Sequence, residues 1–294
     1  MISVVTSVYK KEVYESFSKN LAATTGVVYE LIGIDNSDGS MGLCEVYNKG
    51  AGKAQYDIIC FAHEDILIRT PQWGQIILGI FADNEQLGLI GVAGSSYKPA
   101  VPSGWSYPYA TAATTFMNIV ESSAGRSEPV YCNPDNARLS KVVCIDGLWF
   151  CTRKKIMEKI RFDETTFRRF HCYDVDFSLA VSRHYEVAVT FDILIEHFSA
   201  GSFNAEWIGE TLKLHRKWKQ YLPVNAAGLN AQTQKNEELG SLYFMLRKCV
   251  LLHFPARKLL VHIWSRRILS ILGWKTFLRV NQKMIMAGRA TVQE

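Results

Sequence analysis

Near its start the chain reads Ile2-Ser-Val-Val-Thr-Ser-Val8, and this run of mainly β-branched residues predicts a strand. Tyr9-Lys-Lys11 ends the run, and Val13, Phe17 and Leu21 then recur at every fourth position. That spacing predicts the apolar face of a helix. A strand followed by an amphipathic helix is the first half of a βαβ unit, so this stretch favours an α/β fold.

The alternation of strand and helix continues further along the chain. Apolar runs predict strands over 27–34, 57–62 and 87–92. Between them, helices are predicted over 43–51 and 71–82, the second beginning with a proline suited to a first helical turn. Because strands that alternate with helices build parallel sheets, the predicted fold class is α/β with a mostly parallel central sheet.

The alternating pattern is lost over 94–141, where glycine, proline, serine, threonine and aromatic residues predominate. In an α/β domain this composition favours a long loop on the ligand side, and we keep the segment in the first domain. Regular structure is predicted again as an apolar run over 142–150, helices over 153–159 and 174–183, and a strand over 187–195.

The composition is that of a folded globular protein, since 48% of residues are hydrophobic and no low-complexity stretch interrupts them. The seven cysteines form no CxxC pair and lie mostly in apolar runs, so we expect buried thiols in a reducing compartment. No basic segment precedes the first apolar run, and Lys10-Lys11 interrupts it, which argues against a signal peptide. We therefore expect a cytoplasmic protein.

Positive charge is concentrated at one end of the chain. Residues 245–294 contain ten lysines and arginines against one glutamate, a net charge of +9, so the other residues together carry −4 of the overall +5. We therefore predict a catalytic domain over 1–225 and a basic, largely helical extension over 226–294. A mildly acidic body without a basic stripe excludes nucleic acid as a partner.

Paired cations divide the apolar residues of this basic tail, so no stretch reaches the ~18 apolar residues of a membrane-spanning helix. Cations beside Trp264, Trp274 and Phe277 suit helices that lie among anionic lipid headgroups on the inner face of a membrane. The alternative is that the tail packs on the catalytic domain or on a second subunit, which would make a homodimer.

Polar residues follow several of the predicted strands. Ser7 and Tyr9 follow the first, Asp35-Asn36-Ser37 the second, His63-Glu64-Asp65 the third and Glu196-His197 the last. Ligands of parallel sheets gather at the carboxyl ends of the strands, so these residues are candidates for a binding site. Asp35-Asn36-Ser37 is equally typical of a plain turn.

The sharpest of these signals is His63-Glu64-Asp65, because three potential metal ligands directly follow a buried strand. Mg²⁺ or Mn²⁺ would offset the cost of placing them there and would leave room for diphosphate oxygens. The alternatives are a solvated acidic loop for this triplet and an ordinary hydrogen-bonded histidine for His197.

Four segments, taken in order, resemble the landmarks of family 2 glycosyltransferases with the GT-A fold, including bacterial members. They are Ser3-Val-Val-Thr-Ser-Val-Tyr9, Ile34-Asp-Asn-Ser37, Phe61-Ala-His-Glu-Asp65 and Tyr173-Asp-Val-Asp176. The resemblance spans residues 1–200 and leaves the tail outside it. It implies a nucleotide-diphosphate sugar, most often a UDP-sugar, as donor.

The same resemblance implies roles for individual residues. Asp65 matches the metal-binding aspartate of the DxD motif, while His63 stands where the family has the first aspartate, as in a subset of bacterial members. His197 matches a histidine that approaches the diphosphate or metal. The residues assigned to the nucleotide are Ser7, Tyr9, Asp35 and Glu64.

Tyr173-Asp174-Val175-Asp176 resembles the family's Glu-Asp-x-Asp element, whose first aspartate is the general base toward the acceptor hydroxyl. We therefore predict Asp174 as the base and Asp176 as a second acid of the catalytic site, with Tyr173 replacing the glutamate. The alternative is that Asp174 caps the N-terminus of the helix that follows.

An acceptor-binding region is predicted from aromatic rings that could stack on sugar faces. The candidates for that region are Trp105, Tyr107, Tyr109, Asp146 and Trp149. Aromatic residues are more often part of a core than of a binding surface, and this alternative stays open.

Together these features predict an inverting, metal-dependent glycosyltransferase that moves a sugar to a glycan or lipid-linked acceptor, in surface polysaccharide synthesis by analogy with the family. One alternative is a degenerate relative that binds nucleotide or glycan without turnover, because His63 and Tyr173 replace acids. Another is a nucleotidyltransferase, which fits less well because no glycine-rich, lysine-containing loop follows the first strand.

Overall fold

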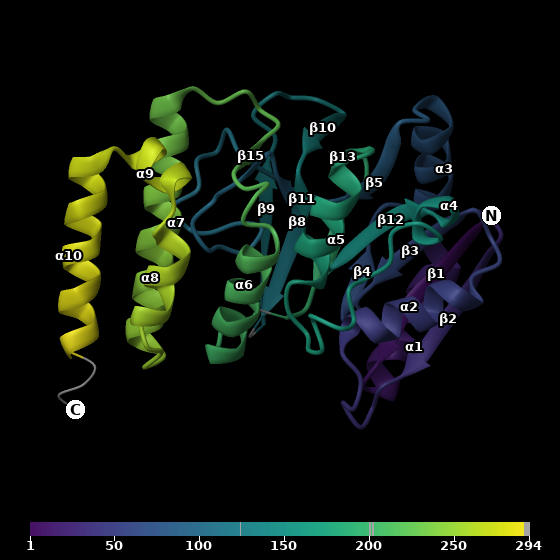
Figure 1. The fold of residues 1–294 in the computed structure, drawn as a ribbon. Coiled ribbons are helices and arrows are strands. Elements are labelled where there is room, and N and C mark those ends of the chain that lie inside the picture. Colours follow the sequence, from purple (N-terminus) through teal and green to yellow (C-terminus); the bar gives the residue numbers. More distant parts are fainter. Residues whose placement is uncertain (124, 200, 202, 291–294) are drawn as a thin grey trace. The chain divides into compact units, whose positions relative to one another are not determined.

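The computed structural model describes residues 1–123, 125–199, 201 and 203–290, and it divides the chain into two compact units (Figure 1). Unit 1 comprises Met1–Ser95 and Thr115–Gly201, and unit 2 comprises Ser96–Thr114 and Ser202–Glu294. This division differs from the predicted one at residue 225, because unit 2 also takes in residues 202–225 and the segment 96–114.

Unit 1 is built on a seven-stranded sheet whose strand order is β10-β13-β5-β12-β3-β1-β2. Its strands are β1 (Ile2–Val8), β2 (Tyr29–Asp35), β3 (Ile58–Ala62), β5 (Leu87–Gly91), β10 (Leu139–Val142), β12 (Trp149–Arg153) and β13 (Glu186–Thr190). β1 is parallel to β2 and β3, and β5 is parallel to β13, whereas β12 and β10 run antiparallel to their neighbours. The predicted, mostly parallel sheet is confirmed.

Helices cover both faces of this sheet. They are α1 (Lys11–Thr24), α2 (Leu43–Lys53), α3 (Trp73–Asp83), α4 (Lys154–Met157) and α5 (Tyr173–Ser182). Ile58 and Cys60 pack with α1 and α3 in one core, whereas Phe61 faces the rings of Tyr47 and Phe162 on the other side. Because side chains alternate along a strand, β3 needs apolar residues at every position, and all five are buried.

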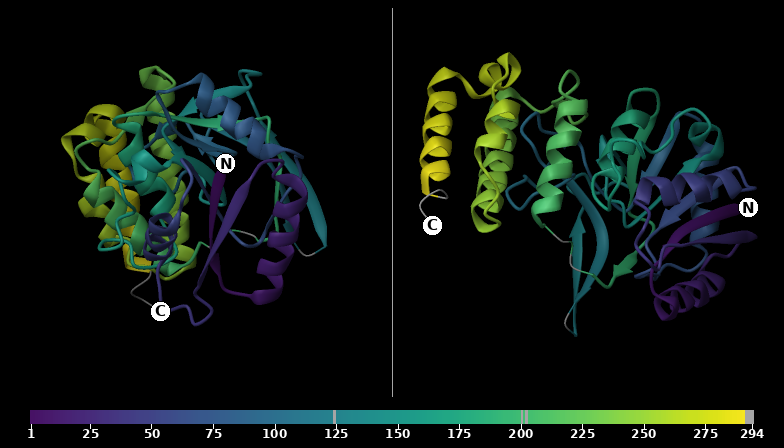
Figure 2. Two further views of the ribbon diagram at one scale, coloured as in Figure 1. Left: turned by 90° about the vertical axis from the view of Figure 1, so that its right-hand side faces the viewer. Right: turned by 60° about the horizontal axis from the view of Figure 1, so that its bottom comes forward.

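A second sheet lies within unit 1 and corrects the prediction of a long loop over 94–141. Its strands are β4 (Ile66–Ile68), β6 (Ala93–Ser95), β8 (Thr115–Ser123), β9 (Arg126–Cys132), β11 (Cys144–Ile145) and β14 (Ile195–His197). β8 and β9 form the long antiparallel hairpin visible in Figure 2. Its strands bury few side chains, β9 being largely exposed, so no clear apolar pattern marks them in the sequence.

Unit 2 is mainly helical, which confirms the predicted helical tail. Its elements are β7 (Tyr97–Lys98), α6 (Ala205–Lys217), β15 (Val224–Asn225), α7 (Ala231–Leu251), α8 (Arg257–Ile263), α9 (Arg266–Leu272) and α10 (Trp274–Ala290). No helix of the described residues is long and apolar enough to cross a bilayer. The side chains of Lys283 and Arg289, and all of Glu294, lie outside the part that the structure describes.

The segment 96–114 belongs to unit 2 because two buried glutamates of α7 hold it. Glu238 accepts hydrogen bonds from the Tyr97 hydroxyl at 2.9 Å and from two backbone amides at 2.8 Å. Glu237 accepts one from the Tyr107 hydroxyl and two from Thr111. Apolar residues of the same segment pack with α6 to α10 in a second core.

Candidate active site

The polar residues predicted at the strand ends meet because of how the strands of unit 1 pair. Thr6 lies opposite Ala62 in the parallel pair β1–β3, so His63 follows at the carboxyl end of the sheet. In the antiparallel pair β4–β14, His197 lies opposite Ile66, next to Asp65. Two sheets thus deliver three potential ligands to one point.

His63, Asp65 and His197 form a cluster whose ligand atoms all lie within 4.8 Å of one another. Oδ1 of Asp65 is 3.9 Å from Nδ1 of His63 and 3.7 Å from Nε2 of His197. Two imidazole nitrogens and a carboxylate oxygen, with room for further ligands, suit a first-row transition ion better than Mg²⁺, which prefers oxygen alone. The donor set therefore fits a divalent metal.

The orientation of His63 is fixed by Tyr173, a contact that could not be predicted from the sequence. Nε2 of His63 lies 2.7 Å from the hydroxyl oxygen of Tyr173, which leaves Nδ1 to face Asp65. Burial is the main cause that lowers the pKa of His63, so the ring stays neutral and can act as a ligand. Tyr173 reaches His63 past Gly147, where a Cβ atom would collide with the hydroxyl group.

Tyr173 and His63 are the two positions at which the chain departs from the family's acidic residues, and they contact each other. The hydroxyl of Tyr173 therefore supplies to His63 the kind of second contact that orients histidine ligands in metal sites. In this structure Nε2 of His197, the nitrogen that faces Asp65, also lies 2.9 Å from the hydroxyl oxygen of Ser199.

Glu64 makes two backbone contacts that were not predicted from the sequence. Its two carboxylate oxygens accept hydrogen bonds from the backbone amides of Tyr9, at 3.1 Å, and Lys10, at 2.9 Å. These amides precede α1, so Glu64 ties the end of β1 to the metal-ligand loop. The nucleotide contact predicted for Glu64 stays a prediction, since each carboxylate oxygen can accept a further hydrogen bond.

The other predicted nucleotide residues lie where β1 and β2 end. Ser7 is half-buried in β1, and the ring of Tyr9 is exposed just after it. Val8 lies opposite Asp35 in the parallel pair, so these residues share one edge of the sheet. Asp35 accepts hydrogen bonds from Ser37, which lower its pKa and which form the turn expected from the sequence.

Asp174 is the most perturbed carboxyl group of the site. Its Oδ2 accepts a hydrogen bond from the Gly147 amide at 3.1 Å. Burial, and after it the negative charge of Asp146, raises the pKa of Asp174 to about 7. A carboxyl group that titrates near neutral pH is suited to accept a proton from a hydroxyl group.

Asp174 does not cap α5, because Cys172 occupies the N-cap position and Asp174 lies in the first helical turn. The N-cap alternative is therefore wrong. Asp176, one residue further into the helix than Val175, is 3% exposed. Of the two aspartates, only Asp174 is partly open to solvent and thus to a substrate.

The residues predicted for the acceptor region lie in different surroundings. Trp149 is fully buried and packs edge-on against Trp73 at 5.7 Å, and Tyr107 is buried against Glu237, so neither can stack on a sugar. Trp105 and Tyr109 belong to unit 2. Asp146 lies beside Asp174, as the raised pKa of Asp174 reflects.

Sequence reasoning missed one aromatic residue of unit 1. Phe170 is 52% exposed, and its ring centroid lies 5.6 Å from that of His63 and 6.4 Å from that of Tyr173. An exposed ring beside the His63–Asp65–His197 cluster offers a flat apolar surface on which a sugar could stack. Its only signal in the sequence is its position three residues before Tyr173.

Residues 3–219 match the model of a family described as "Glycosyltransferase like family". Since this match covers well over half of the chain, the protein belongs to that family. No curated protein matched the sequence.

Solved structures with a similar fold include residues 1–349 of S. aureus TarS in complex with UDP. The TM-score is 0.58 at 12% identity, over 99% of this chain and 89% of that one. The same TarS fragment with UDP-GlcNAc gives 0.58 at 12% identity, over 99% and 90%. GalNAc-T7 with UDP, GalNAc and Mn²⁺ gives 0.51 at 9% identity, over 87% and 58%. These likenesses confirm the GT-A fold.

Proposed function

We propose that this protein is an inverting glycosyltransferase that moves a sugar from a UDP-sugar to an acceptor hydroxyl group. The observation that carries the proposal is the presence together in unit 1 of a His63–Asp65–His197 cluster and a carboxyl group, that of Asp174, with a raised pKa. Family membership and the UDP complexes of structural neighbours support the choice of donor.

In this proposal Asp174 accepts the proton of the acceptor hydroxyl group as its oxygen attacks the anomeric carbon. The Gly147 amide and the fixed helix α5 hold its carboxylate in place. The exposed ring of Tyr9 and the carboxylate of Asp35 border the nucleoside, and Phe170 stacks on a sugar. A single displacement of this kind inverts the anomeric configuration.

His63, Asp65 and His197 would hold the divalent ion, which when bound neutralises negative charge on the departing diphosphate. We propose Mn²⁺ in preference to Mg²⁺, because two of the three ligands are imidazole nitrogens. The contact between His63 and Tyr173 also argues against a degenerate binding protein, since the two departures from the family pattern complete one ligand and its support.

The test is release of UDP from a panel of UDP-sugars, with Mn²⁺ or Mg²⁺ and with candidate acceptors. The proposal expects Mn²⁺-dependent release that requires an acceptor and is lost in Asp174→Asn, with an inverted anomeric centre in the product by NMR. Metal-dependent UDP-sugar binding without any turnover, across the acceptor panel, would instead favour the degenerate binder.

We also propose that unit 2 attaches the protein to the cytoplasmic face of a membrane, where a lipid-linked acceptor for surface polysaccharide would be found. Trp264, which follows α8, and Trp274, the first residue of α10, are each 63% exposed, and the exposed cations Lys275 and Arg279 also lie in α10. Exposed tryptophans among cations suit an anionic interface.

Deleting residues 245–294 would not test this attachment cleanly, because Met245, Leu259 and Ile268 are part of the core of unit 2. Surface changes are the better choice. Trp274→Ser with Lys275→Glu should reduce salt-sensitive binding to phosphatidylglycerol vesicles in co-sedimentation, whereas Lys155→Glu in unit 1 should not. Equal binding by all three proteins would contradict membrane attachment through α10.

A further inference from the structure

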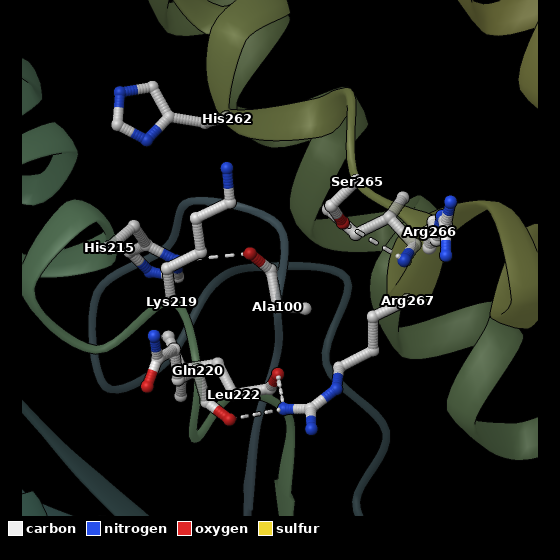
Figure 3. A pocket seen from close by; sticks show the side chains of 10 residues that line it. Ala100, His215, Lys219, Gln220, Leu222, His262, Ser265, Arg266 and Arg267 are labelled. Atoms are coloured by element: carbon white, nitrogen blue, oxygen red, sulfur yellow. Dashed lines mark hydrogen bonds between the residues drawn. The ribbon is translucent and has the colours of Figure 1, made fainter.

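Unit 2 contains a pocket of about 640 Å³ that the proposed transfer site does not use (Figure 3). This volume falls within the range of about 300–1,000 Å³ that is typical of small-molecule sites. The pocket lies between the end of α6, the segment that follows it, and helices α8 and α9. Its lining residues are Ala100, His215, Lys219, Gln220, Leu222, His262, Ser265, Arg266, Arg267 and Ile268.

The charged side chains of this pocket are all basic. Lys219, Arg266 and Arg267 line it, and no aspartate or glutamate does. Within the described residues, no salt bridge involves any of these three cations. Because no carboxylate is paired with these cations, an anion that enters the pocket would be attracted by all three of them.

Hydrogen bonds within the protein hold parts of the pocket wall in place before any ligand binds. Arg267 donates to the carbonyl oxygens of Gln220, at 2.8 Å, and Leu222, at 2.6 Å, as Figure 3 shows. Nε2 of the buried His215 accepts a hydrogen bond from the Ser103 amide at 3.1 Å, which leaves its Nδ1–H to donate to Ala100. A preorganised site loses little conformational entropy on binding.

The pKa of His262 is sensitive to the positive charge around the pocket. Burial, and after it the positive charges of Arg216 and Lys219, lowers the pKa of His262 to about 4. In Figure 3 the Lys219 side chain extends toward the His262 ring. The ring is therefore neutral near pH 7, when it can still donate one hydrogen bond to an oxygen.

We propose that this pocket binds a phosphate or diphosphate ester, with Lys219 and Arg266 as the principal contacts. Lysine and arginine are the side chains that recognise phosphate oxygens, and Arg267 and His262 add positive charge and a donor nearby. The volume leaves room for part of the group that the phosphate carries. This anion site does not depend on the proposed function.

The experiment titrates the full-length protein with sodium pyrophosphate in EDTA, so that no metal can recruit pyrophosphate to the His63–Asp65–His197 cluster. Calorimetry gives the affinity, and NMR of the histidine side chains follows His262. Binding should raise the pKa of His262 by about one unit or more. Lys219→Gln and Arg266→Gln should each weaken binding about tenfold or more, because each removes a charge-assisted hydrogen bond.

Lys275→Gln is the matched control, because Lys275 is an exposed cation of unit 2 outside the pocket. No pyrophosphate binding, or an equal loss in the control and the pocket variants, would overturn the proposal. Asp65→Asn should bind pyrophosphate in EDTA as the unchanged protein does. The experiment can therefore contradict the phosphate site without contradicting the transfer activity. It can also support the phosphate site when the transfer activity is absent.

A second arm separates a lipid phosphate from a soluble one. Vesicles of phosphatidylcholine with phosphatidic acid are mixed with the protein before and after addition of pyrophosphate. Release of the protein by pyrophosphate, with weak vesicle binding by Lys219→Gln, assigns the pocket to a phosphate on a lipid. Unchanged vesicle binding, together with the calorimetric result above, assigns it to a soluble phosphorylated molecule.

Discussion

Asp174→Asn separates the electrostatic role of this carboxyl group from any role in packing. Asparagine has nearly the same shape and can still accept the hydrogen bond from the Gly147 amide, but it cannot ionise or take a proton. The native pKa of Asp174 is about 7, compared with 3.8 for an unperturbed aspartate. The variant therefore removes one unfavourable ionisation and leaves the local structure in place.

The direction in which stability changes with pH follows from how tightly the folded and unfolded states bind the Asp174 proton. The folded protein holds the Asp174 proton more tightly than the unfolded chain, so the stability from this group is complete below about pH 4 and is lost as the pH rises through about 7. Three pKa units correspond to about 4 kcal/mol as an upper bound. The stability advantage of Asp174→Asn should therefore grow by about 2–3 kcal/mol between pH 5 and pH 8.

Urea denaturation of both proteins in EDTA at pH 5 and pH 8 measures this difference, and initial rates of UDP release measure catalysis. A general base contributes about 10²–10⁴-fold, so the variant should be more stable and nearly inactive. Asp176→Asn is the matched comparison, because Asp176 is buried in the same helix. A stability difference that does not vary with pH, or transfer near the normal rate, would refute the role given to Asp174.

Three further changes test the rest of the site. Asp65→Asn should weaken Mn²⁺ and UDP binding together in calorimetry, because it removes a ligand carboxylate. If Mn²⁺ still enhanced the affinity of the variant for UDP as before, Asp65 would not be part of the site. Tyr173→Phe should lower Mn²⁺ affinity about 10–100-fold by freeing the His63 ring, and an unaltered affinity would make that hydrogen bond irrelevant to the metal. Asp146→Asn should lower the pKa of Asp174, so the acidic limb of the pH–rate profile should move to lower pH. An acidic limb that does not move would show that the Asp146 charge does not raise the pKa of Asp174.

The sequence predicted the sheet of unit 1 and the strand-end residues because strands buried on both faces leave an unbroken apolar signature. β3 is such a strand, and His63 and Asp65 could be found simply because they follow it. The hairpin β8–β9 could not be found in this way, because it buries too little to impose alternation on its residues.

Contacts between residues far apart in the chain could not be predicted from the sequence either. The hydrogen bond between His63 and Tyr173 joins residues 110 positions apart, and neither residue type predicts the presence of the other. Trp149 of strand β12 packs against Trp73, which belongs to helix α3 and lies 76 positions earlier in the chain. A ring near a motif cannot be assigned to a core or to a surface until the packing around it is known.

The two glutamates that anchor the segment 96–114 to α7 constrain how this protein can be made. Glu238 bonds to Tyr97 across 141 positions of sequence, so the segment leaves the ribosome long before its partner exists. A chain released after unit 1 is synthesised would expose Tyr97, Val101 and Tyr107 as unprotected apolar surface. We therefore expect unit 2 to assemble late, because its core needs a segment that is made well before the helices that cover it.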